Sequence, residues 1–159
     1  MSARPLYRHT QRGWTLLLAA ALGAAFVLIV VFVLPPAGAE PLPGWVVALI
    51  VGAPLLTLLA FGSLTVSIGD GALAWHFGLG WPRKSLPLTE IVAVQPTRTR
   101  FFEGWGIRLT RRGWLYNVSG FDAVLLTRRD GKTLMLGTDE PRALAAAIER
   151  ARAARTSPP

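Results

Sequence analysis

Two long stretches without a charged residue constrain this chain more than any other feature of its sequence. No Asp, Glu, Lys or Arg lies between Arg12 and Glu40, and again none lies between Glu40 and Asp70. Each gap contains twenty consecutive, mainly apolar residues, 15–34 and 45–64. A helix of that length measures about 30 Å, which matches the hydrocarbon thickness of a bilayer. Because unpaired backbone groups are costly in lipid, the sequence predicts a hairpin of two transmembrane helices.

The distribution of basic residues predicts how this hairpin is oriented. None of the 17 Lys and Arg residues lies in the connection 35–44; three arginines precede the first span and the others follow the second. By the positive-inside rule, both termini are expected on the cytoplasmic side of the membrane. Trp14 and Trp45 stand at the starts of the spans and are expected to be interface anchors. Ala37-Gly38-Ala39 suggests a cleavable signal peptide, which is disfavoured because the apolar stretch is too long.

After the second span the hydrophobic period changes to two. Alternating apolar residues and glycine-containing turns predict about seven short strands, with Asp130-Gly131 as the clearest hairpin signal. Towards the C-terminus, Thr138 or Asp139 can cap a helix with an apolar stripe containing Leu144 and Ile148. The expected regions are a basic cytoplasmic tail (1–13), the transmembrane hairpin (14–64, spans 15–34 and 45–64), an α+β domain (65–154) and a disordered tail (155–159).

Three motifs in the predicted domain are similar to those of a known family. They are Gly106-Ile107-Arg108, Gly113-Trp114-Leu115-Tyr116-Asn117-Val118-Ser119-Gly120 and Gly137-Thr138-Asp139-Glu140-Pro141. With the paired spans, they resemble the bacterial pleckstrin-homology-like small membrane proteins. The resemblance implies a partly open antiparallel barrel of about seven strands, capped by a C-terminal helix. It implies a fold and a location in the bacterial plasma membrane more than an activity.

Residues that could support catalysis are sparse. The chain has no cysteine, which excludes thiolate nucleophiles and Cys-ligated metals, and its two histidines, His9 and His76, are expected in the tail and on a solvent-facing strand. Asp70, Asp122 and Asp130 fall in predicted turns, where carboxylates bond the local backbone. No metal-ligand spacing or phosphate loop is present, and the spans lack the ionisable residues of a transporter. The sequence therefore predicts a protein that is not an enzyme and has no cofactor or metal.

A stretch rich in arginine and aromatic residues is the strongest candidate for a functional surface. Arginines beside aromatic rings can hold lipid phosphates while the rings enter the headgroup layer. The alternative interpretation is that the rings belong to the core and the arginines form a solvated face. The predicted lipid or partner surface consists of Arg98, Arg100, Phe101, Phe102, Trp105, Arg108, Arg111 and Arg112.

The net charge of +8 is compatible with several kinds of partner. Nucleic acid is not expected, because the arginines are scattered and the domain is joined to a membrane. Specific phosphoinositide binding is not expected either, because the first hairpin loop, Gly69-Asp70-Gly71, is tight and acidic. The favoured hypothesis is a non-catalytic interaction module that binds a protein partner or another copy of itself at the bilayer. Two alternatives stay open: an accessory subunit recruited to a larger complex through its spans, and a nonspecific sensor of anionic lipid.

Overall fold

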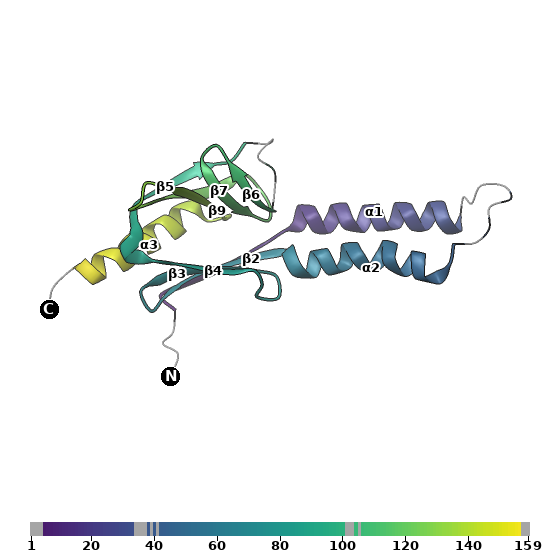
Figure 1. The fold of residues 1–159 in the computed structure, drawn as a ribbon, viewed down its shortest axis with the longest axis horizontal. Helices are drawn as coiled ribbons and strands as arrows, with labels where there is room; N and C mark the ends of the chain where they lie inside the picture. Colours follow the sequence, from purple (N-terminus) through teal and green to yellow (C-terminus); the bar gives the residue numbers. More distant parts are fainter. Residues whose placement is uncertain are drawn as a thin grey trace.

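The protein has an α+β fold, as the sequence predicts, in which two helices project from a body of two β-sheets and a third helix (Figure 1). The computed structural model describes residues 5–33, 38, 40, 42–100, 104 and 106–156. In chain order the elements are β1 (Tyr7–Arg12), α1 (Trp14–Phe32), α2 (Gly44–Phe61), β2 (Ser63–Gly69), β3 (Ala72–Phe77), β4 (Arg83–Pro87), the 3-10 helix η1 (Leu88–Glu90), β5 (Ile91–Arg98), β6 (Gly106–Thr110), β7 (Gly113–Asn117), β8 (Asp122–Arg128), β9 (Thr133–Gly137) and α3 (Pro141–Thr156).

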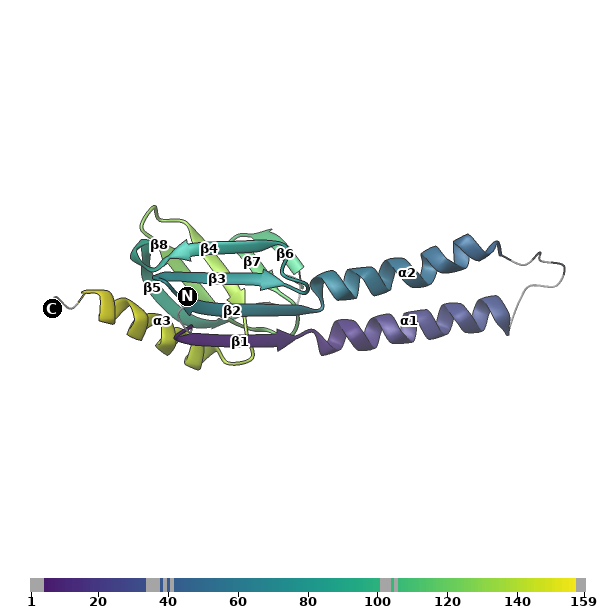
Figure 2. The same cartoon turned by 90° about the horizontal axis from the view of Figure 1, so that it is seen from below.

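The helices α1 and α2 lie side by side and extend away from the sheets (Figures 1 and 2). Among the described residues, one helix is long and apolar enough to cross a membrane: Gly44–Phe61, with a mean hydropathy of 2.2 and no buried residue. The apolar stretch described in α1, Leu17–Phe32, is shorter. The apolar side chains of this helix pair therefore have few partners within the protein itself.

The expected ends of the second span need correction. We predicted this span to continue to residue 64, but α2 ends at Phe61 and Leu64 lies in β2, almost fully buried in the domain core. The reason is that residues 63–69 pair as a strand on both sides, and this pairing takes precedence over their apolar composition. Leu34, the expected last residue of the first span, lies outside the described residues.

Sheet A contains the first four strands in the order β1-β2-β3-β4, with antiparallel neighbours throughout. The prediction of a tail over residues 1–13 is wrong for residues 7–12, because these residues form β1. β1 pairs with β2 along its whole length, from Tyr7 opposite Ile68 to Arg12 opposite Ser63. Its sequence is mostly polar, so its strand conformation depends on this pairing rather than on a local apolar signal.

Sheet B contains the other five strands in the order β5-β8-β9-β7-β6. The expected hairpin at Asp130-Gly131 is confirmed, since β8 and β9 are antiparallel around it. The expectation that all strands are antiparallel is wrong for one pair, because β7 and β9 run parallel. The expected number of about seven strands is too low: β1 was not foreseen, and the single strand expected over 86–94 is two strands, β4 and β5, separated by η1.

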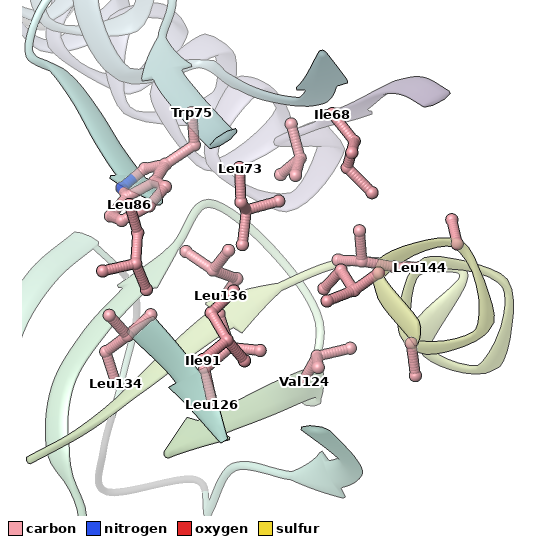
Figure 3. Packing of buried hydrophobic residues seen from close by; sticks show 14 of the residues in the cluster. Ile68, Leu73, Trp75, Leu86, Ile91, Val124, Leu126, Leu134, Leu136 and Leu144 are labelled. Carbon is pink, nitrogen blue, oxygen red and sulfur yellow. The ribbon is translucent and has the colours of Figure 1, made fainter. Parts of the chain in front are cut away.

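The core lies between the two sheets, and α3 closes one of its sides. Figure 3 shows side chains of sheet A, among them Leu73, facing Leu134 and Leu136 of sheet B, while Leu144 enters from α3. The helix packs beside β5, β8, η1 and β2. Each such buried side chain contributes about 1.5–3 kcal/mol of transfer free energy. This packing agrees with the expected closure of the domain by a C-terminal helix.

The two ends of α3 differ from the expected ones. The helix begins at Pro141, and the Thr138 hydroxyl accepts a hydrogen bond from the Glu140 amide, before the first helical residue. Thr138 therefore shapes the turn that leads into the helix. α3 continues to Thr156, so residues 155 and 156, which we expected in a disordered tail, are helical.

The helix pair joins sheet A without a linker. A single residue, Gly13, separates β1 from α1, and a single residue, Gly62, separates α2 from β2. The Gly13 amide donates a hydrogen bond of 2.8 Å to the Gly62 carbonyl, which extends the β1–β2 pairing to the point where α1 begins and α2 ends. The helices are therefore a continuation of the paired strands.

Tyr7 allows a first prediction about stability. Its hydroxyl is buried without a hydrogen-bond partner in the part of the chain that the structure describes, and burial raises its pKa to about 12, with the charges of Glu140 and Asp139 adding to the effect. Above pH ~10 the unfolded chain loses this proton and the folded protein keeps it, so stability falls as the pH rises from ~10 to ~12. Tyr7→Phe should therefore weaken this alkaline loss and stabilise the protein at neutral pH by about 1 kcal/mol.

Denaturant unfolding of both proteins at several pH values between neutral and alkaline would measure this effect. Identical pH profiles for the wild type and Tyr7→Phe would contradict the prediction.

Candidate functional site

The five predicted arginines lie around one open cavity, which we call the arginine cavity. Its volume is about 910 Å³. Phe101, Phe102 and Trp105, which we predicted as part of the same surface, lie outside the described residues. The lining consists of Arg98, Arg100, Arg108, Leu109, Thr110, Arg111 and Arg112.

Two strands that follow each other in the chain, β5 and β6, and the turn after β6 carry most of these side chains. Arg98 ends β5, Arg108 lies in the middle of β6, and Arg111 and Arg112 form the turn from β6 to β7. The Thr110 hydroxyl fixes this turn, since it donates to the Gly113 carbonyl at 2.8 Å and accepts from the Arg112 amide at 3.1 Å.

Gly113 is required where this turn ends. Its φ of +95° belongs to the region that favours glycine, and a Cβ atom there would collide with the backbone carbonyl of Thr133. The position of the two turn arginines therefore depends on this glycine.

Arg112 connects the turn to β5. Its guanidinium donates to the Thr97 hydroxyl at 3.2 Å and to the Arg98 carbonyl at 3.1 Å. Its own carbonyl accepts a hydrogen bond of 2.8 Å from the Thr133 hydroxyl of β9. Arg112 therefore holds the wall of the cavity in place.

The cavity carries an excess of positive charge. Arg98 forms an ion pair with Asp122 at 3.2 Å, while Arg108 and Arg111 have no carboxylate within 4.0 Å among the described residues. A guanidinium presents several N–H donors in a planar fork that matches the oxygens of phosphate and carboxylate groups. The arrangement is therefore suited to binding an anion.

A second, mainly apolar pocket adjoins the arginine cavity, and we call it the α2 pocket. It has a volume of about 610 Å³ and lies where the last turns of α2 meet the start of β6. Arg108 lines both cavities, so one guanidinium stands between basic and apolar surroundings. The lining residues are Thr57, Leu58, Phe61, Gly104, Gly106, Ile107 and Arg108.

His9 lies in an environment that the sequence did not indicate. We expected it in a tail, but it lies on β1 with its Nε2 atom 2.5 Å from a carboxylate oxygen of Asp139 and its Nδ1 atom 3.5 Å from one of Glu140. These partners are separated by about 130 positions in sequence, so no local pattern could have revealed the contact. The contact connects β1 to the start of α3.

Of the other candidates for chemistry, Asp122 lies beside the arginine cavity through its ion pair with Arg98, whereas His76 and Asp130 are not among the residues that line it. His76 is half-buried on β3, opposite Thr65 of β2. Asp130 lies in the β8–β9 turn and accepts a hydrogen bond from the Lys132 amide, as expected for a turn carboxylate. Within the described ranges, no group of three His, Cys, Asp or Glu side chains could hold a metal ion.

The two predicted tryptophan anchors lie at the starts of the projecting helices. Trp14 is the first residue of α1 and Trp45 is the second residue of α2, and both side chains are largely exposed.

Sequence reasoning missed two further exposed apolar residues, Leu79 and Trp81, in the loop between β3 and β4. Their signal was two large apolar residues in a Gly-Leu-Gly-Trp-Pro segment rather than within a strand.

Fold and site together define a small α+β protein with two projecting apolar helices and a basic cavity. No known protein family matches the chain, and no curated protein is similar to it. The resemblance to the bacterial pleckstrin-homology-like family therefore stays a prediction based on the three motifs.

Proposed function

We propose that this protein is a non-catalytic, membrane-anchored module of the bacterial pleckstrin-homology-like type that binds anionic lipid headgroups in its arginine cavity. In this proposal α1 and α2 cross the plasma membrane as a hairpin and both termini are cytoplasmic. The single observation that carries the proposal is the position of the cavity: its five arginines adjoin an apolar pocket at the end of α2, and Arg108 lines both.

The exposed surface of the helix pair supports the anchoring. No residue of α2 is buried, although the helix has a mean hydropathy of 2.2, and α1 runs alongside it. Removing apolar surface from water contributes about 25 cal/mol per Å², so these two helices are far more stable in hydrocarbon than in water. The absence of Lys and Arg from residues 35–44 favours an external connection.

The chemistry of the two adjoining cavities supports a lipid as the ligand. A phospholipid combines an anionic phosphate with apolar chains, and the structure has guanidinium groups on one side of Arg108 and apolar side chains of α2 on the other. Near an anionic surface each basic side chain contributes about 1 kcal/mol. Several arginines in one cavity thus suffice for a preference for anionic over zwitterionic lipid.

The test uses the full chain, purified in a neutral detergent and mixed with phosphatidylglycerol and phosphatidylcholine. Native mass spectrometry would count the lipids that stay bound. We expect the wild type to retain phosphatidylglycerol preferentially, and Arg108→Gln/Arg111→Gln to lower this preference about thirtyfold, because two charges of about 1 kcal/mol each are lost.

The matched control is Arg142→Gln/Arg150→Gln, which removes the same charge from exposed positions on α3 outside the cavity. This control should keep the wild-type preference. Equal lipid retention by the wild type and the cavity variant would exclude the arginine cavity as the lipid site.

A protein partner or a second copy of the chain is the other candidate, and an exposed sheet edge favours it. β6 is the last strand of sheet B, and its Leu109 is 70% exposed beside Trp114, which is 48% exposed. An edge strand with apolar side chains is a template for pairing with another chain. In-cell crosslinking of the wild type and Leu109→Arg would test this: the substitution should remove a partner that binds at this edge and leave crosslinks through the helices unchanged.

A further inference from the structure

The loop between β3 and β4, residues 78–82, lies against the end of α2. The Gly78 amide donates to the Ser63 carbonyl at 2.9 Å, next to the junction of α2 and β2. The backbone of Gly78 lies so close to the helix that a Cβ atom there would be 2.2 and 2.3 Å from the carbonyl oxygens of Leu59 and Ala60. Figure 2 shows β3 ending beside the point where α2 leaves the domain. The loop is therefore level with the last turn of this helix.

This loop exposes two large apolar side chains. Leu79 is 81% exposed and Trp81 is 74% exposed, and each lies directly after a glycine with positive φ. The glycines allow the chain to turn sharply, so that both side chains project away from the core. Basic residues follow immediately, because Arg83 and Lys84 at the start of β4 are exposed.

We propose that the β3–β4 loop is a third membrane anchor, in which Leu79 and Trp81 enter the headgroup layer of the leaflet where α2 ends. The loop combines what an interfacial segment needs: an indole ring, an aliphatic side chain and neighbouring cations that face anionic lipid. It lies against the last turn of α2, a helix that is apolar on every side. The inference rests on the proposed anchoring of α1 and α2 in a membrane.

The anchor has a consequence for the arginine cavity. Gly78 contacts the last turn of α2, and Thr57, Leu58 and Phe61 of the same helix line the α2 pocket. The loop and the pocket therefore lie at the same end of the domain. With Leu79 and Trp81 in the headgroup layer, this end of the domain is held against the lipid that the cavity binds.

The natural absence of cysteine makes a direct test possible. A nitroxide label on Leu79→Cys in the full chain, reconstituted in vesicles of phosphatidylethanolamine and phosphatidylglycerol, reports by electron paramagnetic resonance whether oxygen or a water-soluble nickel chelate reaches it. We expect greater access of oxygen and at least a threefold lower access of the chelate than at Ala154→Cys. Ala154 is the matched exposed control, near the end of α3 on the opposite side of the domain from the helix pair (Figure 1).

A third label, at Leu55→Cys on the exposed surface of α2, separates this inference from the proposed function. If the label at 55 is in hydrocarbon but the labels at 79 and, in a second variant, Trp81→Cys are as accessible to the chelate as the one at 154, the loop is not an anchor and the membrane hairpin stands. If the label at 55 is itself in water, the proposed anchoring fails together with the inference.

Discussion

Deletion of residues 2–12 is expected to unfold the α+β domain that sheets A and B form with α3, because it removes β1. This strand pairs with β2 over six residues, and the Gln11 amide group donates to the Ser119 carbonyl at 2.8 Å. The loss exposes one edge of β2, whose side chains Leu64, Val66 and Ile68 belong to the core. The cost should exceed about 5 kcal/mol, which is comparable with the whole stability of a typical domain. Limited proteolysis and near-ultraviolet circular dichroism of the detergent-solubilised proteins would show it.

The control for this deletion is Arg8→Gln/Arg12→Gln. Both arginines are exposed on β1, so the variant loses the basic charge before α1 but keeps the strand. We expect it to fold as the wild type does. A deletion variant as resistant to protease as the wild type would mean that residues 2–12 behave as a tail after all.

The second large effect is expected for Leu144→Ala. Leu144 is fully buried, and its side chain points from α3 into the core between the two sheets (Figure 3), so its truncation leaves a cavity between α3, sheet A and sheet B. Such substitutions cost about 2–5 kcal/mol. Equilibrium unfolding in denaturant should show a clearly lower midpoint with an unchanged slope.

Arg142→Ala is the matched variant on the same helix. Arg142 is exposed, and its truncation should change the free energy of unfolding by less than about 0.5 kcal/mol. If Leu144→Ala and Arg142→Ala unfold at the same denaturant concentration, α3 does not contribute to the core as described.

The parts of the fold that were predicted correctly have local signals. The β2–β3, β6–β7 and β8–β9 hairpins show alternation on both sides of a glycine-containing turn. β1 could not be predicted, because a polar strand gains its conformation from a partner about fifty to sixty residues further along the chain. The parallel pairing of β7 with β9 could not be predicted either. It depends on how the β6–β7 and β8–β9 hairpins pack beside each other, and the sequence of neither hairpin shows this.

The candidate site was likewise predictable only where its residues are close together in sequence. Its arginines are close in sequence, so they were predicted as one surface, and the turn at Thr110 and Gly113 then determines how they face each other. The α2 pocket was not predictable, because it joins residues about fifty positions apart across the boundary between helix and domain. Leu79 and Trp81 were missed because we searched for basic and titratable residues rather than for apolar residues in loops.

The direct junction at Gly13 and Gly62 also has a mechanical consequence. With one residue on each side and a hydrogen bond between them, we expect both helices to move together with sheet A. A change in the orientation of the domain would then also change the orientation of both helices relative to their surroundings. Conversely, a neighbouring protein that rotates the helix pair would also change the orientation of the arginine cavity.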